Sequence, residues 1–149
     1  RSTLFPYTTL FRSQPLGVNI IFDVAHNPQK IRALVDSLRK LYPDKKPVFV
    51  VAFGQNKHSS LAESLAIIDN LAQLAYATTF SANYGKNHRH VPPENIRHVM
   101  KSAVEVEYNT DKALAKAIKK ARQLDTYVVV AGSFYLVSEF AASQTAAIN

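Results

Sequence analysis

Two short segments combine polar side chains with the start of a helix, where a ligand could bind. The first, Asp23–Pro28, reads Asp-Val-Ala-His-Asn-Pro and follows an apolar run typical of a buried strand. The Asn-Pro pair is typical of a helix start, whose free N–H groups favour an anion. The Asp23 carboxylate could accept hydrogen bonds from a ribose hydroxyl. In the alternative interpretation, Asp23 and Asn27 only cap the turn and His26 has a structural role.

The second segment, Gly132-Ser133, lies between another apolar run and a closing helix that continues through Phe140. Ser133 could bind a ligand at this corner, or it could act only as a helix N-cap, which contributes about 1 kcal/mol. Its sequence neighbours include no general base. The sequence therefore does not support a serine nucleophile.

A glycine turn with polar residues, Gly54–His58, follows the second apolar run. Its Lys57 side chain could offer a positive charge to a phosphate or a carboxylate. The segment does not match the phosphate-binding loop Gly-x-x-x-x-Gly-Lys-Ser/Thr, and the chain, with only 4 glycines, lacks the dinucleotide-binding fingerprint. The sequence thus shows no element that could hold the β- and γ-phosphates of a nucleotide.

Two basic segments are better explained as solvated surface. The segment Ser81–His90 contains His88-Arg89-His90, but without cysteine or paired carboxylates it is a poor metal site, and we predict no metal ligand. The helix expected over residues 111–124 has a lysine-rich face without interleaved aromatic residues, so we expect no nucleic-acid partner.

The elements that would position these segments alternate between strand and helix. We expect strands over residues 18–22, 48–53, 74–80, 104–106 and 127–131, and helices over 28–42, 60–72, 92–100, 111–124 and 134–140. This alternation predicts an α/β fold with a mainly parallel sheet. Ligands bind such sheets beyond the carboxyl ends of the strands. Four loops should therefore share one edge: Asp23–Asn27, Gly54–Ser60, Ser81–His90 and Gly132-Ser133.

Length and composition narrow the class of protein. A chain of 149 residues, 47% of them hydrophobic, predicts one domain with a buried core. The net charge of +7 suggests an anionic ligand such as a nucleotide or a polyanion. No apolar run approaches the ~20 residues of a membrane-spanning helix, and cysteine is absent, so we expect a cytoplasmic protein without a membrane partner.

The N-terminal string RSTLFPYTTLFRS, residues 1–13, differs from the rest of the chain. It has neither a helical nor an alternating period, it repeats a Leu-Phe pair, and it lacks an initiating methionine. The string resembles a translated sequencing adaptor. We expect residues 1–13 to be a non-native artefact and residues 14–149 to be the domain, part of a longer natural protein. The alternative is an ordinary N-terminal strand and turn.

The motifs Asp23–Pro28 and Gly132–Leu136 together resemble one family, the C-terminal domain of folylpolyglutamate synthase/dihydrofolate synthase in the Mur ligase superfamily. The resemblance covers residues 19–140. The first motif also occurs in related Mur ligases, and the Gly-Ser-Phe-Tyr-Leu ending favours the folate branch. The resemblance implies a Rossmann-like, mainly parallel sheet of about six strands flanked by helices.

The resemblance also implies an activity. The family are ATP-dependent amide ligases that phosphorylate a folate or pteroate carboxylate to an acyl phosphate, which the amino group of L-glutamate attacks. By motif, Asp23 would contact the ribose, and Asn27 would belong to the nucleotide site. His26 would be catalytic, near both the nucleotide and glutamate, and Ser133 would help hold glutamate. Lys57 and Arg89 carry over as substrate-binding residues.

The chain also departs from the family. Asn56-Lys57-His58 replaces the usual Asp-Lys-Asp, which puts the interdomain role of that loop in doubt. The phosphate-binding loop and the Mg²⁺ ligands would lie in a missing upstream ATPase domain, so we expect this chain alone to be inactive. Two alternatives stay open. One is a peptidoglycan ligase domain that adds an amino acid to a UDP-linked muramoyl substrate. The other is a non-catalytic nucleotide-binding or interaction module, with helix 111–124 on an acidic partner.

Overall fold

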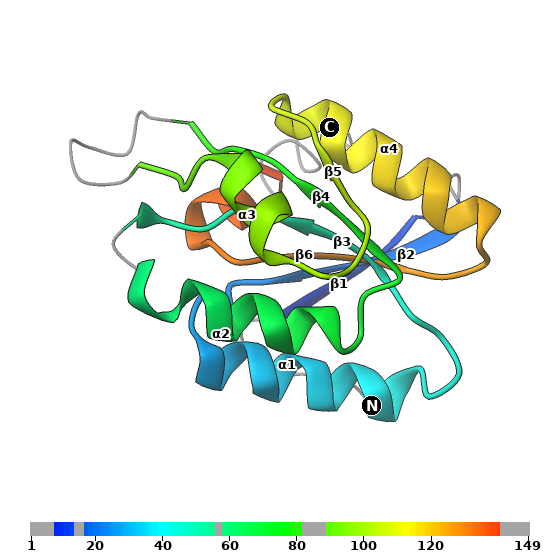
Figure 1. Cartoon of the computed structure of the whole chain (residues 1–149). Helices are drawn as coiled ribbons and strands as arrows, with labels where there is room; N and C mark the ends of the chain where they lie inside the picture. Colours follow the sequence, from blue (N-terminus) through cyan, green and yellow to red (C-terminus); the bar gives the residue numbers. More distant parts are fainter. Residues whose placement is uncertain (1–7, 14–16, 56–57, 82–88, 141–149) are drawn as a thin grey trace.

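The computed structural model describes residues 8–13, 17–55, 58–81 and 89–140 (Figure 1). The elements follow one another as β1 (Thr8–Ser13), β2 (Val18–Asp23), α1 (Pro28–Leu41), β3 (Val48–Val51), α2 (His58–Asp69), β4 (Leu74–Ala77), α3 (Pro93–Val99), β5 (Val104–Val106), α4 (Thr110–Gln123) and β6 (Val128–Ala131). Residues 134–140 form a further helical segment after β6. No helix in the described ranges is long and apolar enough to cross a membrane.

The strands form one sheet in the order β1-β2-β6-β3-β4-β5. Strand β6 lies at its centre and pairs in parallel with both neighbours, so that Val129 lies opposite Ile21 of β2 and Phe49 of β3. Strands β4 and β5 continue the parallel arrangement. The predicted α/β fold with a mainly parallel sheet is therefore confirmed.

The prediction of about six strands in this sheet needs one correction. The sheet has six strands, but its parallel part contains only five, from β2 to β5 inclusive. The sixth strand, β1, pairs with β2 in antiparallel orientation over its whole length. Strand β1 comes from the segment that we expected to lie outside the domain. Strand pairing depends on backbone hydrogen bonds, which the irregular side-chain pattern of residues 8–13 does not reveal. The non-native origin of residues 1–13 stays a prediction.

Helices cover both faces of the sheet (Figure 1). Buried residues of α1, α2 and α3, among them Leu34, Leu65 and Ile96, pack in one core cluster with alternate residues of the strands. Residues of α4 and of segment 134–140, among them Leu114 and Phe140, pack in a second cluster on the opposite face. Because helices cover both faces, the central strands are apolar throughout, as in the fully buried run Val128–Ala131.

Local signals explain the helix starts, with one exception. Asn27 caps α1 and Asn109 caps α4, and each side-chain oxygen accepts a hydrogen bond of 2.9 Å from the third backbone N–H that follows. Helix α2, in contrast, starts at His58 rather than at the predicted Ser60. Strand β4 is also shorter than expected and ends at Ala77, and the Thr79 hydroxyl beyond it donates to the Tyr108 carbonyl.

Candidate ligand site at the carboxyl edge of the sheet

The two motif-bearing turns meet at the carboxyl edge of the sheet. The backbone N–H of Gly132 donates a hydrogen bond of 2.8 Å to the carbonyl of Ala25, in the turn after β2. Gly132 has φ +110°, and a Cβ at this position would lie 2.5 Å from the carbonyl oxygen of Ala52 and 3.1 Å from the Phe53 ring. Only glycine fits this corner, because it combines a positive φ with close backbone contact.

At this meeting point, the helices that follow the two strands pack on opposite faces of the sheet. Helix α1, which follows β2, packs in the first core cluster, whereas segment 134–140, which follows the neighbouring strand β6, packs in the second. Adjacent parallel strands whose helices leave to opposite faces open a crevice at their carboxyl ends, and ligands bind there in open α/β sheets. The crevice between β2 and β6 is therefore the candidate site.

Strand β2 delivers Asp23, His26 and Asn27 to this edge. The Asp23 side chain is 6% exposed, and its Oδ1 accepts a hydrogen bond of 2.7 Å from the Ala25 N–H, so this carboxylate does close the turn. His26 Nδ1 lies 3.0 Å from the Val24 carbonyl oxygen. Because a carbonyl only accepts, this contact requires the proton on Nδ1 and leaves Nε2 as the acceptor of the neutral ring. Among the described residues, Nε2 has no hydrogen-bond partner.

Strand β6 delivers Ser133, which is 5% exposed. Its Oγ accepts a hydrogen bond of 3.1 Å from the Tyr135 N–H, and its carbonyl accepts from the Val137 N–H. Ser133 is thus the cap of the following helix, as one of the two interpretations predicted. A hydroxyl both accepts and donates, and within the described residues no partner takes the Ser133 proton, so it can still donate to a ligand.

The loops after β3 and β4 join the same edge. Gly54 and His90 form an antiparallel bridge. The Gln55 N–H donates to the Arg89 carbonyl at 2.8 Å, and the Val91 N–H donates to the Phe53 carbonyl at 2.7 Å. Arg89 is exposed there. The prediction that all four loops share one edge is confirmed for the described residues.

Lys57, another predicted substrate-binding residue, lies outside the described residues, and so do Asn56 and His88.

Aromatic rings connect the loop after β4 to the Ser133 corner, and sequence reasoning missed these contacts. The Phe80 ring lies edge-on to His90, with 5.7 Å between ring centroids, and at 5.7 Å from Tyr135 on its other side. Tyr135 in turn contacts Phe134, whose ring is 60% exposed. The sequence gives one signal, the apolar Phe80 beyond the last strand residue, but no pattern shows which loops it joins.

Hollows also occur at the opposite, amino edge of the described surface. Two cavities, of about 360 and 130 Å³, share Lys45, Asp125 and Thr126 as lining residues at the amino edge of the sheet. Within the described ranges, no group of three His, Cys, Asp or Glu side chains lies close enough to hold a metal ion.

The fold is a Rossmann-like α/β domain, and its candidate site lies at the switch point of the sheet. The family model of the Mur ligase glutamate ligase domain matches residues 9–134. The chain belongs to this family. No curated protein sequence matches the chain significantly.

Solved structures show the same fold. A bifunctional folylpolyglutamate synthase/dihydrofolate synthase from Yersinia pestis, complexed with AMPPNP and Mn, is 24% identical with a TM-score of 0.74 over 92% of this chain. Folylpolyglutamate synthase from Mycobacterium tuberculosis, complexed with ADP and AMPPCP, is 21% identical with a TM-score of 0.72, also over 92%. The matches cover only 30% and 31% of those chains. The chain thus spans about a third of the length of these enzymes.

Proposed function

We propose that this chain is the C-terminal domain of an ATP-dependent ligase that adds L-glutamate to dihydropteroate or tetrahydrofolate. The observation that carries the proposal is the hydrogen bond between Gly132 and Ala25, because it brings the two family motifs to one crevice. Family membership supports the ligase class. A structurally similar bifunctional synthase, 22% identical with a TM-score of 0.71, is described with Mn, AMPPNP and L-glutamate bound, which supports the ligands.

The turn after β2 would bind the nucleotide. The buried Asp23 carboxylate would accept from a ribose hydroxyl, and Asn27 would hold the start of α1, whose N–H groups favour negative charge. The described residues fit the sugar better than the phosphates. Because the sequence has no phosphate-binding loop, we propose that the groups for the β- and γ-phosphates and the Mg²⁺ ligands lie in an upstream ATPase domain. ATP supplies the phosphoryl group that activates the substrate carboxylate.

The corner after β6 would bind glutamate. The Ser133 hydroxyl would donate to one carboxylate, and the exposed Arg89 guanidinium, with Lys57, would pair with negative charge. In the ligation step, the glutamate nitrogen forms a bond to the carbonyl carbon of the acyl phosphate. The bond from that carbon to the phosphate oxygen breaks, and phosphate leaves. The ammonium proton must be lost first, and His26 Nε2 would accept it.

Calorimetry on the 149-residue chain tests the proposal. We expect Asp23→Asn to weaken ADP binding and Ser133→Ala to weaken L-glutamate binding, each with little effect on the other ligand. We expect that this chain alone does not release ADP from ATP. We also propose that the ligase is located in the cytoplasm. Salt-sensitive polyanion binding that neither variant changes would instead support an interaction module. In the longer protein, turnover with a UDP-muramoyl acceptor and not with dihydropteroate would support a peptidoglycan ligase.

A further inference from the structure

Two contacts attach the helix after Ser133 to the loop after β4. The proposed reaction uses neither of them. The Ser81 N–H donates to Glu139 Oε1 at 2.5 Å, so a carboxylate of the helix holds the start of the loop. One residue earlier, the buried Phe80 ring packs against Tyr135 of the same helix. The start of the loop is thus attached to the helix through both a backbone group and a side chain.

The end of the same loop is fixed to the sheet. Arg89 and Val91 pair with residues after β3 through backbone hydrogen bonds, and the His90 ring lies against Phe80. The Phe53 ring, at the end of β3, lies next to Gly132. A chain of contacts through Phe80, His90 and Tyr135 therefore links the backbone at Arg89 to the helix that follows Ser133.

We propose that Glu139 and Phe80 are positioning residues, which set the separation between Arg89 and Ser133 and so select an amino acid with two carboxylates by its length. The inference rests on the proposed function, which assigns both groups to glutamate. A guanidinium can pair with one carboxylate in a bidentate geometry, and the Ser133 hydroxyl can donate to the other. A ligand that bridges two fixed points must match their spacing, and L-aspartate is one methylene shorter than L-glutamate.

The Glu139 contact is suited to this role. A hydrogen bond to a carboxylate is about twice as strong as one between neutral groups. The Glu139 side chain is partly buried, which limits its exchange with water. Removing its oxygens would leave the Ser81 N–H to find a new arrangement, and the loop start could then shift relative to the helix.

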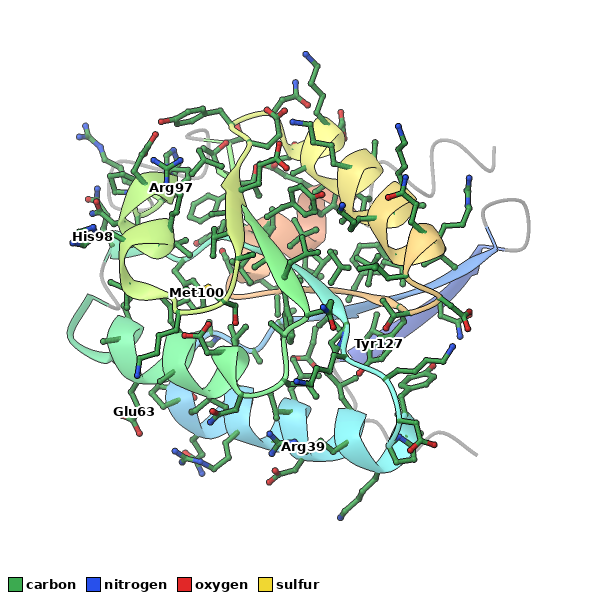
Figure 2. All side chains as sticks on the ribbon, turned by 45° about the vertical axis from the view of Figure 1, so that its right-hand side comes forward. Arg39, Glu63, Arg97, His98, Met100 and Tyr127 are labelled. Carbon is green, nitrogen blue, oxygen red and sulfur yellow. The ribbon has the colours of Figure 1, made fainter. Side chains whose placement is uncertain are left out.

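The test is an NMR titration of the isotope-labelled 149-residue chain with L-glutamate and with L-aspartate, followed at the Ser133 and Tyr135 amides. The variants are Glu139→Ala, Glu139→Gln, which keeps an acceptor oxygen, and Phe80→Leu, which enlarges the space between the rings. The matched control is Glu63→Ala, because Glu63 lies on α2 (Figure 2) and its one ion pair among the described residues, 3.5 Å from Arg32, is exposed. A denaturation midpoint for each variant separates folding from positioning.

We expect the unsubstituted chain to prefer L-glutamate. Glu139→Ala should weaken L-glutamate binding about tenfold and remove most of the preference over L-aspartate. Glu139→Gln, which keeps an acceptor but loses the charge, should have a smaller effect in the same direction, and Glu63→Ala should stay within about twofold. Phe80→Leu should reduce the preference in the same direction. An unchanged preference in Glu139→Ala, or an equal loss of both ligands together with a lower denaturation midpoint, would overturn the inference alone. No L-glutamate shifts in the unsubstituted chain would overturn the glutamate assignment, and the inference with it.

Discussion

Gly132 donates its backbone N–H to the carbonyl of Ala25 at 2.8 Å, and this hydrogen bond joins the turn after the first parallel strand to the corner after the last. The two strands are far apart in the sequence but neighbours in the sheet. Their helices leave toward opposite faces, so the bonded turns form the two sides of one crevice.

Substitution of Gly132 by alanine should destabilise the domain by about 2–4 kcal/mol, through backbone strain and overpacking. Its φ is +110°, and the new Cβ would lie 2.5 Å from the Ala52 carbonyl oxygen. The matched control is Gly17→Ala, because Gly17 has φ +64° with nothing within 4 Å of the added Cβ. Gly17→Ala should cost only about 1 kcal/mol, from strain alone. Urea unfolding measures both, and equal losses would show that the close contact at Gly132 has no energetic effect.

Substitution of Tyr127, labelled in Figure 2, by phenylalanine should stabilise the domain by about 1 kcal/mol, because its buried hydroxyl has no hydrogen-bond partner among the described residues. Burial, and secondarily the nearby Tyr42, raises the pKa of Tyr127. The folded state therefore favours the neutral phenol. The free energy of unfolding is unaffected by this group below the ordinary tyrosine pKa of about 10, and it falls as pH rises above that value.

Guanidinium unfolding of Tyr127→Phe near neutral pH and above pH ~10 tests both effects. The variant should be more stable than the unsubstituted chain and should lose less stability in alkali. Tyr42→Phe is the control, because the Tyr42 hydroxyl accepts a hydrogen bond of 3.4 Å from Asn19 Nδ2 and its removal should bring no gain. Equal behaviour of the two variants would argue against an unsatisfied hydroxyl at Tyr127.

Substitution of Lys116 by methionine should raise the pKa of Glu107. The Asn109 N–H, and then the Lys116 ammonium at 3.0 Å, hold the pKa of this carboxyl below its ordinary value. A lowered pKa in the folded state stabilises the domain above the ordinary carboxyl range, and this stability is lost as pH falls through the folded pKa. Because Asn109 remains, the pKa should not return to its ordinary value.

Carbon-13 NMR titration of the Glu107 carboxyl measures this change. Lys119→Met is the control, since Lys119 lies on the same helix but does not contribute to the lowered pKa. The assignment fails if Lys119→Met shifts the titration as much as Lys116→Met does.

Removal of either asparagine cap should lower the free energy of unfolding by a similar amount, but only one of the two substitutions should affect ligand binding. Asn27→Ala and Asn109→Ala each remove a capping hydrogen bond of 2.9 Å, so each should lose about 1 kcal/mol. Only Asn27 lies at the crevice, so only its substitution should weaken ADP binding in calorimetry. An equal loss of ADP affinity in Asn109→Ala would mean that reduced stability, and not the position of the cap, causes the effect.

The sequence predicted those features that repeat along the chain. Apolar runs and helical stripes indicated the parallel strands and the helices, and the rule for carboxyl ends predicted that the turn at Asp23 would share an edge with Ser133. Strand β1 agrees with the alternative interpretation of residues 1–13, an ordinary N-terminal strand, which the irregular side-chain pattern of this segment did not favour. The contacts of Phe80 and Glu139 were missed for a different reason: they join residues distant in the sequence, and no periodic signal identifies such partners.

The most direct test of the central claim is a backbone NMR titration of the chain with ADP and, separately, with L-glutamate. If the two turns form one site, both ligands should shift the amide of Gly132, which donates the hydrogen bond at the crevice, and the amide of Ala25, whose carbonyl accepts it. Ligand shifts confined to the cavities at the amino edge, around Lys45 and Thr126, would contradict the account.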